Sequence, residues 1–122
     1  MAHLKMLCVD DKEDLRKSLT QQFTNEDFDV DTAEDGDVAL EKIKANHYDI
    51  VLMDLKMPKM SGKDVLIEMR KLNKNPYVII LSAGDDLTVA QECVKLGAKD
   101  YIQKPYDPEE LLHVVIKVLG SA

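Results

Sequence analysis

Short apolar runs alternate along the chain with longer segments in which apolar residues recur at a helical period. The apolar runs have the length of strands and lie at residues 4–9, 28–32, 50–53, 77–81 and 101–103. After the first run, Leu15, Leu19 and Phe23 recur at a spacing that places one apolar face on a helix. The alternation predicts five strand–helix units.

Polar residues at the segment boundaries indicate where several helices begin and end. Ser61, with Asp64 three residues later, resembles a capping box at a helix start. A fourth helix is expected over about residues 86–96, with Gly97 as its left-handed stop. Asp107 precedes a last helix, which is expected to bury Leu111, Leu112, Val115, Ile116 and Leu119.

These units predict an α/β fold in a single domain over residues 1–122. Successive parallel strands need right-handed crossovers, so helices are expected on both faces of one parallel sheet. Cys8 and Cys93 lie in apolar patterns that suit buried free thiols rather than a disulfide. Together with the absence of a membrane-length apolar run or a signal-peptide pattern, they predict a cytoplasmic protein.

The charge balance argues against two classes of partner. The chain has 23 acidic and 16 basic residues and a net charge of −7, so neither nucleic acid nor a membrane is expected as a direct partner. Seven acidic residues follow one another without an intervening Lys or Arg: Glu26, Asp27, Asp29, Asp31, Glu34, Asp35 and Asp37. A solvated face is the favoured interpretation of this run, and a patch that faces a partner is the alternative.

Side chains capable of chemistry stand at the ends of the predicted strands. In chain order they are Asp10 and Asp11, Asp54, Ser82, and Lys104. The carboxyl ends of parallel strands form one edge of a sheet, where open α/β sheets bind their ligands. Three neighbouring carboxylates need a compensating cation, and their oxygen atoms suit Mg²⁺. The sequence therefore predicts a Mg²⁺ site at this edge.

Asp54 differs from the other two carboxylates because it stands alone at the end of the strongest buried strand. A carboxylate can attack a phosphoryl group and form an aspartyl phosphate. The transfer needs cations and donors around the phosphoryl oxygens, which Mg²⁺, the Lys104 amine and the Ser82 hydroxyl can supply. Asp54 is therefore the candidate nucleophile.

Four motifs in register resemble those of bacterial two-component response-regulator receiver domains. They are Val9-Asp10-Asp11, Leu52-Met53-Asp54-Leu55-Lys56-Met57-Pro58, Ser82-Ala83 and Lys104-Pro105. The resemblance extends from Met6 to about Leu119, and four motifs together are far more specific than any one of them. It implies a flavodoxin-like, doubly wound (βα)5 fold with the five strands in the order 2-1-3-4-5.

The resemblance also implies roles for the acidic residues. Asp54 would be the phosphoacceptor and Asp11 a direct Mg²⁺ ligand. Asp10 would hold a metal-bound water, and the backbone carbonyl of Lys56 would be the third protein ligand. As an alternative for the acidic pair, Asp10 and Asp11 could simply cap the first helix.

Further roles follow from the same resemblance. Lys104 would pair with the phosphoryl group, and its bond to Pro105 would be cis. Phosphorylation would draw Ser82 inward and let Tyr101 turn into the vacated space, which would switch a partner-binding surface. The implied partners are a sensor histidine kinase or a histidine phosphotransfer protein and an unidentified downstream protein, with phosphorylation-dependent dimerisation left open.

Such a domain would catalyse its own phosphorylation and dephosphorylation without being an enzyme in the usual sense. By the same resemblance, two flanking residues would tune the phosphate lifetime in opposite directions, because Gly84 leaves the approach open to water and Lys56 could obstruct it. No output domain follows the last helix in this sequence. The chain is therefore expected to be either a stand-alone relay or a receiver excised from a longer regulator.

Three other functions share parts of this pattern. A phosphatase-like hydrolase needs a general acid two residues after its aspartate nucleophile, where this chain has Lys56. A flavodoxin-like cofactor binder needs a Ser, Thr or Gly-rich phosphate loop after the first strand, where this chain has Asp10 and Asp11. A receiver-shaped interaction module that accepts no phosphate would not need the intact acidic triad.

Overall fold

A computed structural model describes residues 3–120, and these residues form one sheet of five parallel strands. The order across the sheet is β2-β1-β3-β4-β5, and every adjacent pair is parallel. Both features confirm the predicted fold. The strands are β1 (Lys5–Val9), β2 (Asp29–Ala33), β3 (Ile50–Asp54), β4 (Tyr77–Ser82) and β5 (Asp100–Gln103).

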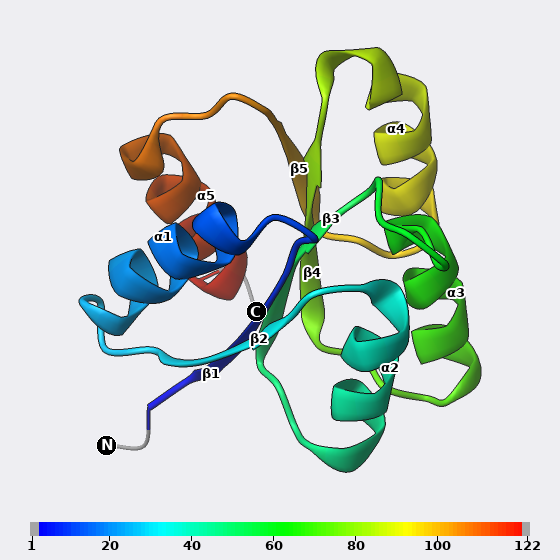
Figure 1. The fold of residues 1–122 in the computed structure, drawn as a ribbon, viewed down its shortest axis with the longest axis horizontal. Helices are drawn as coiled ribbons and strands as arrows, with labels where there is room; N and C mark the ends of the chain where they lie inside the picture. Colours follow the sequence, from blue (N-terminus) through cyan, green and yellow to red (C-terminus); the bar gives the residue numbers. More distant parts are fainter. Residues whose placement is uncertain (1–2, 121–122) are drawn as a thin grey trace.

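Helices cover both faces of the sheet, as Figure 1 shows, with α1 and α5 on one face and α2, α3 and α4 on the other. None of the helices in residues 3–120 has the length and apolar character that a membrane span requires. The helices are α1 (Glu13–Thr24), α2 (Gly36–Ala45), α3 (Gly62–Lys71), α4 (Leu87–Lys95) and α5 (Pro108–Gly120), and a 3₁₀ turn, η1 (Gly84–Asp86), precedes α4.

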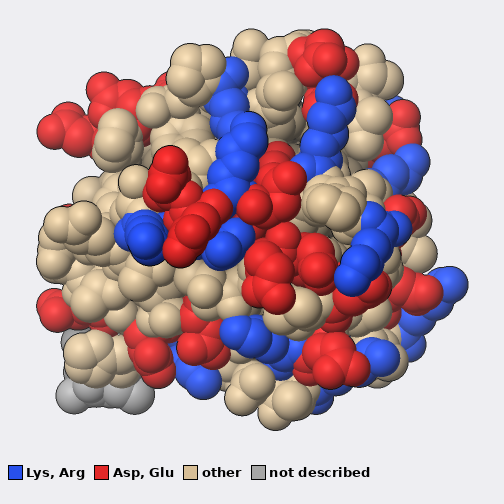
Figure 2. Space-filling view, viewed as in Figure 1, with Lys and Arg blue, Asp and Glu red and all other residues tan. Residues whose placement is uncertain are grey.

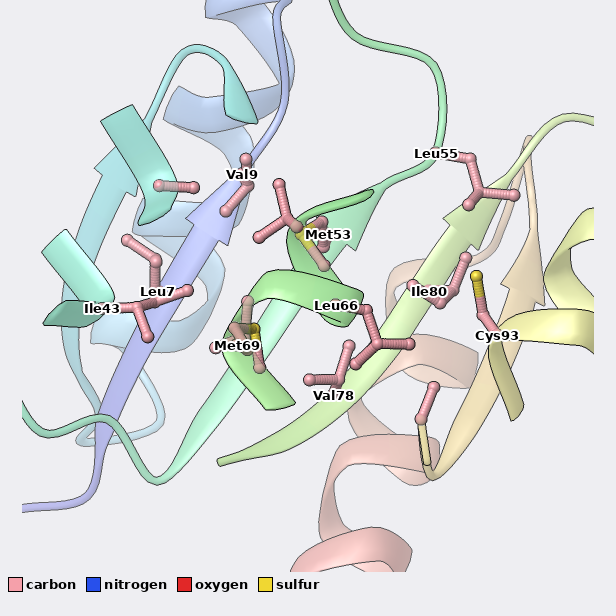
Figure 3. Packing of buried hydrophobic residues seen from close by; sticks show 14 of the residues in the cluster. Leu7, Val9, Ile43, Met53, Leu55, Leu66, Met69, Val78, Ile80 and Cys93 are labelled. Carbon is pink, nitrogen blue, oxygen red and sulfur yellow. The ribbon is translucent and has the colours of Figure 1, made fainter. Parts of the chain in front are cut away.

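The central strand β3 is buried along its whole length, because helices pack on both of its sides. Successive side chains of a strand point to opposite faces. Ile50 and Leu52 therefore pack with the α1 and α5 side, whereas Val51 and Met53 pack with α2, α3 and α4. Figure 3 shows the second cluster, in which Met53 lies among side chains from β1, β4 and α3. Burial on both faces holds β3 in the middle of the sheet, and Asp54 is the last residue of this strand.

The expected fourth helix is confirmed, since α4 begins at Leu87 directly after the 3₁₀ turn η1. One prediction about a helix needs correction. Ile116 is 58% exposed, although the sequence predicts it as buried. Val115 occupies the inward stripe of α5, and the next residue of an α-helix lies about 100° further round.

Several predicted turn and cap signals are confirmed. Ser61 and Asp64 form the reciprocal bonds of a capping box at the start of α3. Gly97 ends α4 with a φ of 114°, a left-handed conformation that favours glycine. Cys8 and Cys93 are both buried and free.

The acidic run that spans β2 has mixed environments. Asp31 accepts a hydrogen bond of 2.7 Å from the Tyr48 hydroxyl, and Asp35 accepts one of 2.9 Å from the backbone N–H of Val38 at the start of α2. The other five members, Glu26, Asp27, Asp29, Glu34 and Asp37, are exposed. Figure 2 shows acidic and basic side chains interleaved over the face in view. A solvated face therefore describes most of the run but not Asp31 and Asp35.

Candidate phosphoryl and metal site

The parallel sheet brings the predicted site residues to one edge. Asp10 directly follows β1, while Asp54 and Ser82 are the last residues of β3 and β4. Lys104 directly follows β5, and its backbone N–H donates to the Ser82 carbonyl at 2.7 Å. Residues separated by up to 94 positions in sequence therefore meet, as the strand-end argument predicts.

Three carboxylates gather at this edge. Oxygen atoms of Asp10, Asp11 and Asp54 all lie within 4.8 Å of one another. Asp10 is fully buried, Asp54 is 6% exposed, and Asp11 is exposed. Carboxylate oxygens at this spacing suit a hard divalent cation, and Asp11 offers it a solvent-facing approach. The donor set of this chain therefore fits Mg²⁺.

Lys104 lies between two of the three carboxylates. Its Nζ is 2.9 Å from Asp10 Oδ2 and 3.4 Å from Asp54 Oδ2. The second oxygen of Asp10 accepts a hydrogen bond of 2.9 Å from the backbone N–H of Lys12. These contacts satisfy the buried Asp10 carboxylate on both sides, which a buried charge requires.

The helix-cap alternative for the acidic pair is wrong. Helix α1 has Lys12 as its N-cap residue, and no side chain caps it. Asp10 bonds to the turn before the helix, and the Asp11 carboxylate has no hydrogen-bond or ion-pair partner within residues 3–120. The pair is therefore left for another role.

Burial raises the pKa of Asp54 above the ordinary value of 3.8. The Lys104 ammonium opposes this shift in pKa, and the negative charges of Asp10 and Asp11 add to it. The folded protein therefore binds a proton at Asp54 more tightly than the unfolded chain does. The ionised form of Asp54 therefore destabilises the folded state. This loss of stability develops as the pH rises from the pKa of the unfolded chain through the higher pKa of the folded protein.

We therefore expect Asp54→Asn to raise the free energy of unfolding at neutral pH in the presence of EDTA. The gain should shrink towards pH 3, where the carboxyl of the original protein is protonated in both states. Urea denaturation across this pH range measures both quantities. Asp37→Asn, which alters an exposed acidic residue of α2, is the control. A destabilised Asp54→Asn protein at neutral pH would contradict the expectation.

Ser82 carries an unsatisfied polar atom. Its side chain is 1% exposed, and its Oγ has no hydrogen-bond partner among the described residues. Buried hydroxyl groups without a partner are uncommon in folded proteins and cost free energy. The group stands at the end of the strand next to that of Asp54, where a ligand oxygen at the site could accept its hydrogen bond.

The Lys56 amine pairs with two aspartates outside the carboxylate cluster. Its Nζ lies 3.3 Å from Asp85 Oδ2 and 3.6 Å from Asp86 Oδ2. These two ion pairs join the loop after β3 to η1. The side chain is 65% exposed, so this is a surface contact of modest strength. Gly84 is exposed, and a side chain there would meet only the end of Gln103.

Two further predicted residues flank the site. The peptide bond between Lys104 and Pro105 is cis. Tyr101 lies on β5, is partly buried and packs against the core cluster beneath α2, α3 and α4.

Arg16 and Gly62 contact the site, although the sequence pattern did not indicate a role for either residue. Arg16 Nη1 donates to the backbone carbonyl of Asp10 at 2.8 Å. A Cβ atom at Gly62 would lie 2.5 Å from the carbonyl oxygen of Asp54, so only glycine allows α3 to start so close to β3. The sequence signals available for these two residues were weak. They are an arginine soon after the acidic pair and a glycine just after the Ser61 cap, and both residue types are common at such positions without a functional role.

Comparison with known proteins places this chain in a family. The family model for the response regulator receiver domain matches residues 6–116. Regulatory protein AtoC of Escherichia coli is 36% identical over 115 residues, which are 94% of this chain and 25% of that protein. Response regulator ArlR of Staphylococcus aureus is 34% identical over 115 residues, 94% of this chain and 52% of that protein. The chain thus spans a quarter to about half of these relatives.

Solved structures agree. The receiver domain of the Francisella response regulator 1452 superimposes with a TM-score of 0.89 at 34% identity, covering 98% of both chains. A CheY-like response regulator receiver domain protein from Methanospirillum hungatei superimposes with a TM-score of 0.92 at 28% identity, covering 98% of this chain and 96% of the other. The family match, the shared fold and the strand-end site agree with one another. This chain belongs to the response regulator receiver domains of two-component signalling.

Proposed function

We propose that Asp54 accepts a phosphoryl group from a phosphohistidine of a sensor histidine kinase or a histidine phosphotransfer protein. The observation that supports this most strongly is the arrangement around one carboxylate. Lys104 Nζ lies 3.4 Å from Asp54 Oδ2, and Asp54 shares its carboxylate cluster with Asp10 and Asp11. The orphan hydroxyl of Ser82 at the neighbouring strand end completes the set of groups that such a transfer needs.

In the proposed transfer, one carboxylate oxygen of Asp54 forms a bond to phosphorus. The phosphorus–nitrogen bond of the donor breaks, and its electron pair leaves with the imidazole. Lys104 then exchanges a carboxylate partner for a phosphoryl oxygen, and the Ser82 hydroxyl donates to a second one. Lys104 already lies 3.4 Å from Asp54 before the reaction, whereas Ser82 would move towards the phosphoryl group as it binds.

The residues that would hold Mg²⁺ are Asp11, Asp54 and the backbone carbonyl of Lys56, with Asp10 acting through water. When bound, the ion supplies positive charge to the phosphoryl oxygens and compensates the carboxylates. Asp10 is already bonded to Lys104 and to the Lys12 N–H, which favours an indirect role for it. Asp11 has the exposed carboxylate that a direct ligand needs.

Self-catalysed hydrolysis of the aspartyl phosphate belongs to the same proposal. Water must reach the phosphorus opposite Asp54, and two observations favour an open approach. The Lys56 amine is held by Asp85 and Asp86, and Gly84 offers no side chain to block the way. The domain would thus catalyse its own phosphorylation and dephosphorylation rather than turn over a separate substrate.

The output would be a conformational switch. A phosphoryl group that accepts the Ser82 hydrogen bond would draw the end of β4 towards Asp54, and Tyr101 on β5 would turn into the vacated space. The changed surface would then bind a downstream protein or a second copy of the chain. NMR measurement of the Tyr101 χ1 angle with and without a phosphoryl analogue tests this switch, and an unchanged angle would refute it.

A groove beside Lys104 is the proposed docking surface for the phosphohistidine protein. It has a volume of about 580 Å³, contains Lys104 itself and is bordered by α1 and by the loop after β5. Its apolar lining includes Leu15, Leu19, Pro105 and Tyr106. Because the groove includes Lys104, which contacts Asp54, a partner helix bound in it would bring its histidine close to the site, and an apolar groove suits the face of such a helix.

Leu15→Asp should therefore slow phosphotransfer from a phosphorylated histidine protein by about tenfold. Transfer from acetyl phosphate should be unchanged, because that donor needs no docking surface. Leu72→Asp, at an exposed leucine that follows α3, is the matched control and should leave both rates unchanged. Equal loss of both reactions in Leu15→Asp would point to a damaged site instead of a lost docking contact.

The experiment that tests the proposed function is incubation with acetyl phosphate and Mg²⁺, followed by intact-mass measurement. We expect a gain of one phosphoryl group that requires Mg²⁺ and is lost after mild alkaline treatment, as an acyl phosphate should be. No gain over a range of Mg²⁺ concentrations and pH values would favour the interaction module that accepts no phosphate. A cytoplasmic location stays a prediction, consistent with the two free buried cysteines.

A further inference from the structure

Arg16 bonds to the acidic edge of the site through the backbone and not through a carboxylate. It lies in the second turn of α1, is partly buried, and its Nη1 donates to the carbonyl oxygen of Asp10 at 2.8 Å. That carbonyl belongs to the peptide unit that joins Asp10 to Asp11. Because a peptide unit is planar, fixing its oxygen also fixes the direction in which the chain enters Asp11.

The Asp11 side chain depends on this backbone contact for its placement. Its carboxylate has no hydrogen-bond or ion-pair partner in the described part of the chain, whereas Asp10 is bonded through both carboxylate oxygens. Asp11 can therefore be directed towards Asp54 only by its own backbone. Within residues 3–120, Arg16 is the one side chain that bonds to the peptide preceding Asp11.

Arg16 also brings positive charge without occupying a ligand atom. Lys104, another cation at this edge, bonds directly to carboxylate oxygens of Asp10 and Asp54. The guanidinium of Arg16 uses a carbonyl oxygen instead, so it leaves the carboxylates available to a metal. Groups that orient metal ligands in this way typically change metal affinity by about 10- to 100-fold when they are removed.

We propose that Arg16 is a positioning residue for the divalent-metal site, which it prepares by fixing the peptide between Asp10 and Asp11. This inference rests on the proposed function, because it assumes that the three carboxylates bind Mg²⁺. It extends that function by naming a residue that neither contacts the metal nor reacts, yet sets the affinity for the ion.

Arg16→Met tests the inference, and Lys17→Met is its matched control. Both substitutions remove one positive charge from α1 and keep an apolar stem. Lys17, however, is exposed and, among the described residues, pairs only with Glu13. Loss of charge alone near an acidic site should make Mg²⁺ bind slightly more tightly. Loss of positioning should make it bind more weakly, so the two explanations predict opposite signs.

Mg²⁺ affinity should be measured by isothermal titration calorimetry at constant ionic strength. We expect binding about tenfold weaker in Arg16→Met, unchanged or slightly tighter in Lys17→Met, and partly restored in Arg16→Lys. Phosphorylation by acetyl phosphate in Arg16→Met should need more Mg²⁺ but reach the original rate at saturation. Thermal unfolding in EDTA shows whether each variant is folded. If Arg16→Met does not fold, the comparison of Arg16→Lys with Lys17→Met still tests the inference.

The outcomes separate failure of this inference from failure of the proposed function. If the original protein binds no Mg²⁺, the proposed metal site itself is wrong. If the original protein binds Mg²⁺ and Arg16→Met binds it as tightly as Lys17→Met does, the metal site stands and the role of Arg16 is refuted.

Discussion

Asp54→Asn is expected to accept no phosphoryl group from acetyl phosphate, a loss of at least about 10³-fold in rate. The amide keeps the shape of the side chain but lacks the anionic oxygen that forms the bond to phosphorus. Neighbouring carboxylates cannot replace it, because Asp10 is fully buried and bonded to Lys104, and Asp11 is exposed and unsupported. Intact mass over time measures the loss directly.

Two controls accompany this prediction. Asp37→Asn removes an exposed acidic residue of α2 and should be phosphorylated at the original rate. Urea denaturation should show that Asp54→Asn is folded and at least as stable as the original protein, since burial disfavours the charge it removes. A phosphorylated Asp54→Asn protein would assign the acceptor to another residue.

Gly62→Ala should disturb the fold and the site together. A Cβ atom at this position would lie 2.5 Å from the carbonyl oxygen of Asp54 and 3.2 Å from the Cα of Leu55. Both neighbours are backbone atoms, and the Gly62 N–H also donates to the Leu55 carbonyl at 2.9 Å. Helix α3 must therefore move away from β3, which we expect to cost about 3 kcal/mol of stability.

The same displacement should slow phosphorylation by about tenfold or more, because small errors in the placement of a reacting group have large kinetic effects. Gly120→Ala is the matched control, since nothing lies within 4 Å of a Cβ atom there. Chemical denaturation and phosphorylation rates should be measured for both variants. Equal stability of the two proteins would show that the contact at Gly62 relaxes without cost.

The convergence of Asp54 and Lys104 could be predicted from the sequence because it depends only on topology. Apolar runs of strand length, separated by helical segments, require a parallel sheet, and a parallel sheet places all strand ends at one edge. The strand boundaries were less accurate: the strands end at Asp54 and Ser82 themselves, one residue later than predicted. The convergence was unaffected, because Asp54 and Ser82 stand at the same edge of the sheet whether they are the last residues of their strands or the first after them.

Features that depend on tertiary packing could not be predicted in the same way. The segment 111–119 is apolar at many positions, so its period does not decide whether Val115 or Ile116 faces the sheet. The contact of Arg16 with the Asp10 carbonyl and the close approach of Gly62 to Asp54 both arise from how a helix start packs on a strand end. Nor does the sequence indicate that the Ser82 hydroxyl lacks a partner, because that follows from its burial.

A crystal structure with Mg²⁺ and beryllofluoride, a phosphoryl analogue, decides whether these strand-end groups act as one reaction centre. We expect beryllium bonded to a carboxylate oxygen of Asp54, with Lys104 Nζ and Ser82 Oγ each within about 3 Å of a fluorine atom. The ion should lie between Asp11 and the Lys56 carbonyl. If Ser82 Oγ still lacks a partner and Lys104 stays on Asp10, the groups are neighbours without a shared function.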